Sequence, residues 1–211
     1  MTNQSIRVFV NLALLTVICC GCGGLSYRVR VNGFGDATSS KAKSYWLLPV
    51  ESAADVELRE QAVYIHKGLM EAGFIPAGSY AEADVLVMFV YDTKDGYYYY
   101  NQKYFILRLE GYYPIEGLAL AELPMEWKLE LLISGTPNHR RQLLPVLVAT
   151  GVPYYGRSST KVVESEIDDD DPLLERIRMA PETLGPLLPF GLPVKPGDAK
   201  PVTGQNRPKV I

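Results

Sequence analysis

Apolar and charged residues alternate along MEWKLELLISG, residues 125–135. A period of two is typical of a strand that has one face in water. The segment ADVLVMFVYD, residues 83–92, is almost continuously apolar and predicts a central strand instead. Further strands are predicted at residues 44–50, where the apolar run stops near Pro49, and at residues 160–167.

Between two of these strands lies a stretch with a helical period, residues 55–72. Its apolar positions recur at intervals of four, three and four residues, at Leu58, Ala62, Ile65 and Leu69. Gly73 follows in the position where a glycine commonly ends a helix. Residues 44–92 therefore predict a strand–helix–strand unit.

A second helix is predicted over residues 138–151, with Asn138 as its cap. Pro145 would kink this helix unless it lies in the first turn. The elements together indicate an α+β fold, with an antiparallel or mixed β-sheet packed with two or three helices. We expect a single domain over residues 41–180.

The segments on either side of this domain differ in composition. Residues 22–40 contain one short alternating piece, residues 27–31, which is either a first strand or part of a tether. Residues 181–211 hold seven prolines and four glycines. Such a composition cannot pack a core, and it predicts a disordered C-terminal tail.

Seven of the fourteen tyrosines fall within residues 97–113. The preceding Lys94-Asp95-Gly96 predicts a turn between two strand-like runs. One interpretation is a twisted hairpin held together by aromatic pairs. The other is a surface that binds a partner or a glycan, because tyrosine is enriched at binding surfaces. The residues of this predicted partner surface are Tyr97, Tyr98, Tyr99, Tyr100, Tyr104, Tyr112 and Tyr113.

The N-terminus has the layout of an export signal. A short polar start with Arg7 precedes the mostly apolar residues 8–18, and small residues follow. The apolar run is shorter than the roughly 20 residues that a membrane-spanning helix needs. We therefore predict that residues 1–21 are a signal peptide; an uncleaved anchor, plain secretion and a buried apolar helix are the alternatives.

All three cysteines, Cys19, Cys20 and Cys22, lie where this signal ends. A structural zinc site would need about four ligands, and the only histidines, His66 and His139, are isolated. The segment resembles the lipobox of bacterial lipoproteins, which implies that Cys22 carries a lipid, with Cys20 a poorer acceptor. Stable anchoring requires roughly two acyl chains. By resemblance to enterobacterial sorting, Gly23 after Cys22 favours the outer membrane, facing the periplasm.

The charge balance limits the classes of partner. The whole chain has a formal net charge of −3, and removal of residues 1–21 takes away Arg7 and leaves −4. A nucleic-acid-binding surface would be basic, so we expect no nucleic-acid partner. The expected partners are the membrane, through the lipid, and an envelope protein.

Catalytic motifs are missing from the sequence. It holds no G-x-S-x-G, H-E-x-x-H or phosphate-loop pattern. Ser134 and His139 are near neighbours, but hydrolysis would also need an orienting acid and an oxyanion hole. The acidic run at 168–171 could bind a hard cation through oxygens, although a solvated turn that begins a helix is the simpler interpretation. We predict no catalysis, no cofactor and no metal.

The order of these motifs resembles a bacterial lipoprotein family catalogued as domain of unknown function four-one-three-six. The resemblance rests on the export signal and lipobox, on AKSYWLLP, on a helix that ends in Gly73-Phe74, and on the strand at 83–87. It implies a lipid-anchored envelope protein and brings no established chemistry. We expect a binding or scaffolding role; the alternatives are a periplasmic hydrolase and an auxiliary subunit of a lipid or polysaccharide exporter.

Overall fold

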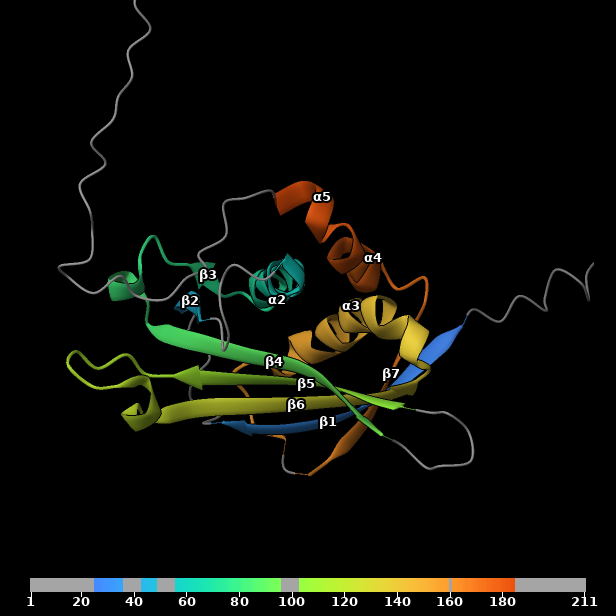
Figure 1. The fold of residues 1–211 in the computed structure, drawn as a ribbon, viewed down its shortest axis with the longest axis horizontal. Coiled ribbons are helices and arrows are strands. Elements are labelled where there is room, and N and C mark those ends of the chain that lie inside the picture. Colours follow the sequence, from blue (N-terminus) through green and yellow to red (C-terminus); the bar gives the residue numbers. More distant parts are fainter. Residues whose placement is uncertain (1–24, 36–42, 49–55, 96–102, 160, 185–211) are drawn as a thin grey trace, which may run out of the picture.

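Seven strands form one sheet in the order β3-β2-β4-β5-β6-β1-β7 (Figure 1). The computed structural model describes residues 25–35, 43–48, 56–95, 103–159 and 161–184. The strands are β1 (Ser26–Gly35), β2 (Ser44–Leu48), β3 (Ile75–Pro76), β4 (Val85–Asp95), β5 (Lys103–Tyr112), β6 (Met125–Gly135) and β7 (Val163–Asp168). Because β2 is parallel to β3 and β4 while the other pairs are antiparallel, the sheet is mixed.

The four α-helices lie on one side of this sheet (Figure 1). They are α2 (Val56–Glu71), α3 (Arg140–Gly151), α4 (Pro172–Arg178) and α5 (Ala180–Leu184). Short 3₁₀ turns are η1 (Tyr80–Glu82), η2 (Leu120–Glu122), η3 (Pro137–His139) and η4 (Val152–Tyr154). The predicted α+β fold is confirmed, with two long helices at the predicted places and two short ones after β7.

The predicted strand–helix–strand unit is present as β2-α2-β4. Its two strands pair directly in parallel, with Tyr45 opposite Val85. The helix ends at Glu71, and Gly73 has a φ of +91°, a conformation that costs glycine little. Leu58, Ala62, Ile65 and Leu69 all contribute to the core, so the apolar stripe faces the sheet as predicted.

Two local predictions are wrong. Strand β4 continues through Lys94 and Asp95, which pair with Tyr104 and Lys103, so these two residues are not a turn. Asn138 does not cap α3: it lies in η3, and no side chain caps this helix start. Pro145 lies beyond the first turn inside α3, where its ring removes one backbone donor.

The alternation in the N-terminal segment extends over a full strand. Residues 26–35 form β1, which lies between β6 and β7, so the sheet includes residues before the expected domain start at 41. At the other end, α5 contains the first residues of the predicted tail, 181–184. Residues 1–24, with the predicted signal peptide and Cys22, and residues 185–211 lie outside the described residues.

The main core lies between the sheet and its helices. Alternate residues of each strand point into it, and Leu107, Leu109, Leu129 and Leu131 are fully buried there. Trp127 is almost fully buried, and its ring lies against Gly111 of the neighbouring strand. A Cβ atom at residue 111 would overlap the indole ring, so the tryptophan requires a glycine at this position.

Candidate functional site

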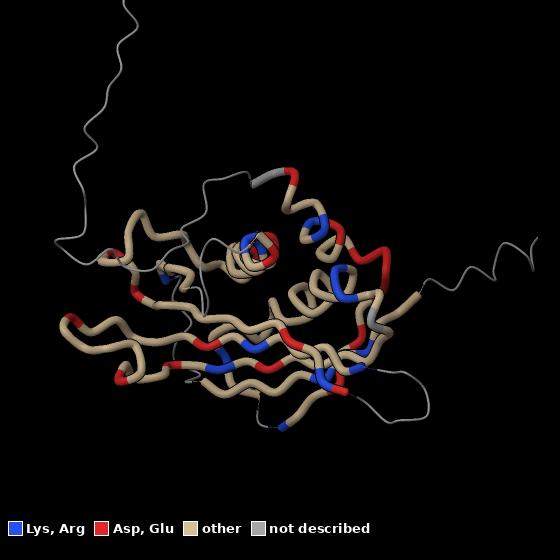
Figure 2. Tube along the Cα trace, viewed as in Figure 1, with Lys and Arg blue, Asp and Glu red and all other residues tan. Residues whose placement is uncertain are grey.

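The other face of the sheet carries no helix in Figure 1. We call this surface the open face, and it consists of the outward residues of five strands: Arg28, Arg30, Asn32, Val90, Asp92, Tyr104, Ile106, Arg108, Glu110, Lys128, Glu130, Leu132, Ser134, Glu164 and Glu166. Figure 2 shows positive and negative positions side by side along its strands. The open face is therefore a mixed-charge surface and not a second core.

Ion pairs join the central strands of the open face. Arg108 Nε donates to Glu130 Oε2 at 2.7 Å, and Lys128 Nζ donates to Glu110 Oε1 at 2.6 Å. The Tyr112 hydroxyl also donates to Glu110, at 2.6 Å. Burial raises the pKa of Glu110, but these hydrogen bonds outweigh it and the pKa is lowered overall. These groups use their charges within the sheet.

Beside these pairs the open face contains a shallow groove of about 260 Å³. It crosses strands β5, β6, β1 and β7, and its lining side chains come from Arg28, Arg30, Tyr104, Leu132, Ser134 and Glu164. The strand register explains the arrangement, because Arg30 lies opposite both Leu132 and Glu164, and Tyr104 lies opposite Ser134. Residues far apart in the sequence therefore form one concave surface.

The polar groups of this groove are only partly paired. Arg30 forms an ion pair with Glu164 at 3.5 Å, and both side chains are mostly exposed. Within the described part of the chain, the guanidinium of Arg28 and the hydroxyls of Tyr104 and Ser134 make no hydrogen bond or ion pair. One cation and two hydroxyl groups are thus available to a ligand, and Leu132 supplies an apolar floor.

The predicted tyrosine surface is divided between two places. Tyr104 lines the groove, whereas Tyr112 lies eight positions further along β5, where it bonds to Glu110. Burial and the Glu110 carboxylate raise the pKa of Tyr112 to about 12. Tyr113 lies beneath the Lys43 ammonium, 5.0 Å from its ring centre. Tyr97, Tyr98, Tyr99 and Tyr100 lie outside the described residues.

The two ends of the sheet differ in what they carry. At one end, which we call the Leu25 end, β1 and β5 begin and β4 and β6 end. At the opposite end, the Tyr113 end, β2, β4 and β6 begin and β1 and β5 end. Exposed large apolar side chains gather at the Tyr113 end, namely Phe34, Ile75, Tyr113, Ile115, Leu118 and Met125. The groove lies toward the Leu25 end.

Neither histidine lines a described pocket. His66 is buried in α2 beneath Tyr45, whose hydroxyl bonds to its Nδ1, and burial and Lys67 lower its pKa to about 4. His139 is exposed, and its Nδ1 lies 3.2 Å from the Thr136 hydroxyl. Ser134 belongs to the groove and forms no hydrogen bond with His139 among the described residues. The geometry therefore does not assemble the serine–histidine pair of a hydrolase.

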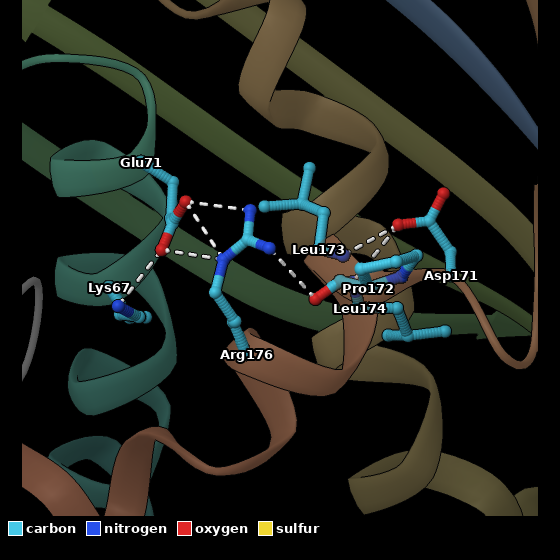
Figure 3. A network of polar contacts seen from close by, with 7 residues as sticks. All are labelled: Lys67, Glu71, Asp171, Pro172, Leu173, Leu174 and Arg176. Atoms are coloured by element: carbon cyan, nitrogen blue, oxygen red, sulfur yellow. Dashed lines mark hydrogen bonds and ion pairs between the residues drawn. The ribbon is translucent and has the colours of Figure 1, made fainter.

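The acidic run at 168–171 has structural roles. Asp171 caps α4 by accepting from Leu173 N at 2.7 Å, and Pro172 is the first residue of that helix, as Figure 3 shows. Asp169 accepts from Arg178 and from the Tyr27 hydroxyl. No group of acidic, histidine or cysteine residues within the described chain could hold a metal ion. The interpretation of this run as a turn that begins a helix is confirmed.

The same region clamps two helices together. Glu71 of α2 accepts from Lys67 at 2.9 Å and from Arg176 of α4 at 3.0 Å (Figure 3). The hydrogen bonds from Arg176 lower the pKa of this carboxylate. The clamp fixes α4 against α2 on the covered side of the sheet, away from the groove.

Sequence reasoning missed Arg28, Arg30 and Glu164. The alternation of residues 27–31 predicts which positions share a face of a strand, but it does not show that β7 will be the neighbour of β1. It also predicts that Glu126 lies on a wet face, and this is wrong. An irregularity in the pairing near Gly111 turns Glu126 inward, where it pairs with Lys43.

Comparisons with known proteins place few constraints on this chain. No family model and no curated protein matches it. Two crystal structures of the PelC dodecamer from Paraburkholderia phytofirmans are similar at 11% and 9% identity, each with a TM-score of 0.38, over 60% and 61% of this chain and 95% and 98% of theirs. A PDZ domain protein from Parabacteroides distasonis is similar at 10% identity with a TM-score of 0.42, over 69% of this chain and 40% of its own.

Proposed function

We propose that the protein is a lipid-anchored, non-catalytic binding protein of a bacterial cell envelope. The anchor is the diacylated Cys22 predicted from the lipobox, and the membrane is the outer membrane on its periplasmic side. None of the described helices is long and apolar enough to cross a membrane, so this proposal relies on the lipid and not on a span. The resemblance to the lipoprotein family of unknown function supports the same placement.

The observation that carries the binding role is the groove on the open face. It is concave, about 260 Å³ in volume, and it holds a guanidinium and two hydroxyl groups without partners among the described residues. A helix-free sheet face that keeps such groups available is suited to an anionic or hydroxyl-bearing surface of a partner. Its central residues are Arg28, Tyr104 and Ser134.

The anchor is tested by the mass of the N-terminal peptide from protein expressed in a bacterial envelope. A diacylglyceryl group on Cys22, with residues 1–21 absent, supports the proposal. A peptide that begins at Met1, or an unmodified Cys22, refutes the lipid anchor.

The binding role is tested by photo-crosslinking in intact cells. A photoreactive amino acid replaces Tyr104 in the groove or, as a matched control, Tyr64 on α2 of the covered side. We expect a discrete crosslinked product from position 104 and none from position 64. If a charge-assisted hydrogen bond is worth about 1.5–3 kcal/mol, Arg28→Ala should weaken the contact about tenfold or more. Equal labelling from both positions would contradict a specific role for the groove.

A further inference from the structure

The path from the proposed anchor to the sheet is very short. Only Gly23, Gly24 and Leu25 separate Cys22 from Ser26, the first residue of β1. The carbonyl of Leu25 already accepts from Asp169 N at 2.8 Å, so Leu25 is held by the folded domain. A fully extended chain spans at most about 3.6 Å per residue, which places Leu25 within about 11 Å of Cys22.

From this tether length we infer that the Leu25 end of the sheet faces the bilayer, at the level of its headgroups. The inference rests on the proposed lipid anchor at Cys22. Strand β4 has eleven residues, so at about 3.3 Å per residue the Tyr113 end stands roughly 35 Å further from the membrane. A domain held by three residues at one end cannot bring its opposite end to the bilayer without lying flat.

The side chains fit this orientation. Leu25 is 63% exposed next to the anchor, where an apolar residue can contact the acyl boundary. Asp95 and Asp168 at the same end give no cationic patch, so the contact should not require anionic lipids. The exposed apolar residues at the Tyr113 end, with Ile115 and Leu118 among them, point away from the membrane.

This orientation also constrains the ligand of the groove. Arg28 is three positions beyond Leu25 along β1, and Tyr104 is the second residue of β5 at the same end. The groove therefore opens within about 20 Å of the bilayer surface by strand rise. Its ligand must be reachable at that height, as a group held near the membrane is.

Fluorescence quenching from the membrane surface tests the orientation. The mature lipidated chain has no free thiol, so Asp95→Cys and Glu116→Cys each provide a single labelling site, at the Leu25 end and the Tyr113 end respectively. Each labelled protein is reconstituted in phosphatidylcholine vesicles that contain headgroup-nitroxide lipid. We expect quenching at position 95 to exceed that at position 116 at least threefold, and to be unchanged by added phosphatidylglycerol.

Equal quenching at the two positions, or stronger quenching at position 116, would overturn the orientation. A variant with ten Gly and Ser residues inserted before Leu25 provides the tether control. A flexible linker of that length reaches roughly 17 Å on average, and the difference between the two positions should shrink. A difference that persists undiminished would show that the tether does not set the orientation.

Flotation of the same vesicles separates the two claims. If the protein does not float with vesicles and carries no lipid, the proposed anchor fails and the orientation fails with it. If the protein floats and the two labels are quenched equally, the anchor stands and only the orientation is refuted.

Discussion

The two faces of the sheet are built from the same strands and do different work. In β6, Leu129 points into the core and is fully buried, whereas Leu132 points to the open face and lines the groove. In β1, Val29 is buried and its neighbour Arg28 is exposed. The covered face therefore supplies the stability of the domain, and the open face leaves polar groups available for binding. Each of the following predictions compares these two surfaces.

The largest difference is expected for leucines on opposite faces of β6. Leu129→Ala leaves a cavity in a fully buried site and should lower the free energy of unfolding by about 2–5 kcal/mol. Leu132→Ala removes a partly exposed side chain and should cost less than about 1 kcal/mol. Chemical denaturation of both variants measures the difference, and equal losses would break the division between the faces.

The second effect is a pH dependence from the covered side. The pKa of His66 is about 4 in the folded protein, below its ordinary value of 6.5, because the ring is buried. The unfolded chain therefore binds a proton more readily, and the stability from the neutral ring is complete above pH 6.5 and is lost as the pH falls toward 4. The full effect is roughly 3 kcal/mol.

Denaturation at pH values from 7.5 to 5 isolates this histidine, because carboxylates with lowered pKa values, such as Glu71, titrate below that range. His66→Gln should flatten the pH profile, whereas His139→Gln on the exposed turn should leave it unchanged. A dependence that survives in His66→Gln would assign the effect to another group.

A smaller effect is expected at the start of α4. Asp171→Ala removes the helix cap and should cost about 1 kcal/mol. Asp170→Ala, the neighbouring exposed residue in the same acidic run, should change stability by less than about 0.5 kcal/mol. Thermal unfolding distinguishes the pair, and a larger loss at position 170 would contradict the assignment of the cap.

The smallest change in stability is expected on the open face. Arg28→Ala should alter the free energy of unfolding by less than about 0.5 kcal/mol, as should the exposed control Lys161→Ala. Only the first variant should reduce crosslinking from position 104. A loss of binding in both variants would show that the groove cation is not specific.

The periodicity of the sequence predicted most of the elements, because each reflects burial of one side of a strand or helix. The run at 125–135 is β6 and the stripe at 55–72 is α2, within a residue at either end. Glu126 departs from the pattern because its position depends on an irregular pairing with β5. Such a pairing is a property of two strands and leaves no signal in either one alone.

The candidate site was harder to predict for the same reason. Tyr104 was identified from tyrosine content, but Arg28 and Glu164 are 136 positions apart and meet only because β1 enters the sheet between β6 and β7. Tyr112 was grouped with Tyr104 by sequence, yet a bond to Glu110 holds it in a separate place. Composition indicated a sticky segment, and topology determined which part of it lines a concave surface.

Side-chain oxidation by hydroxyl radicals, compared between intact cells and the purified mature domain, tests the division between the two faces most directly. If the open face binds an envelope component, Tyr104 and Leu132 should oxidise several-fold more slowly in cells, while the exposed Val56 on the helical side should not change. Equal rates at Tyr104 and Leu132 in both preparations would contradict a binding role for the open face.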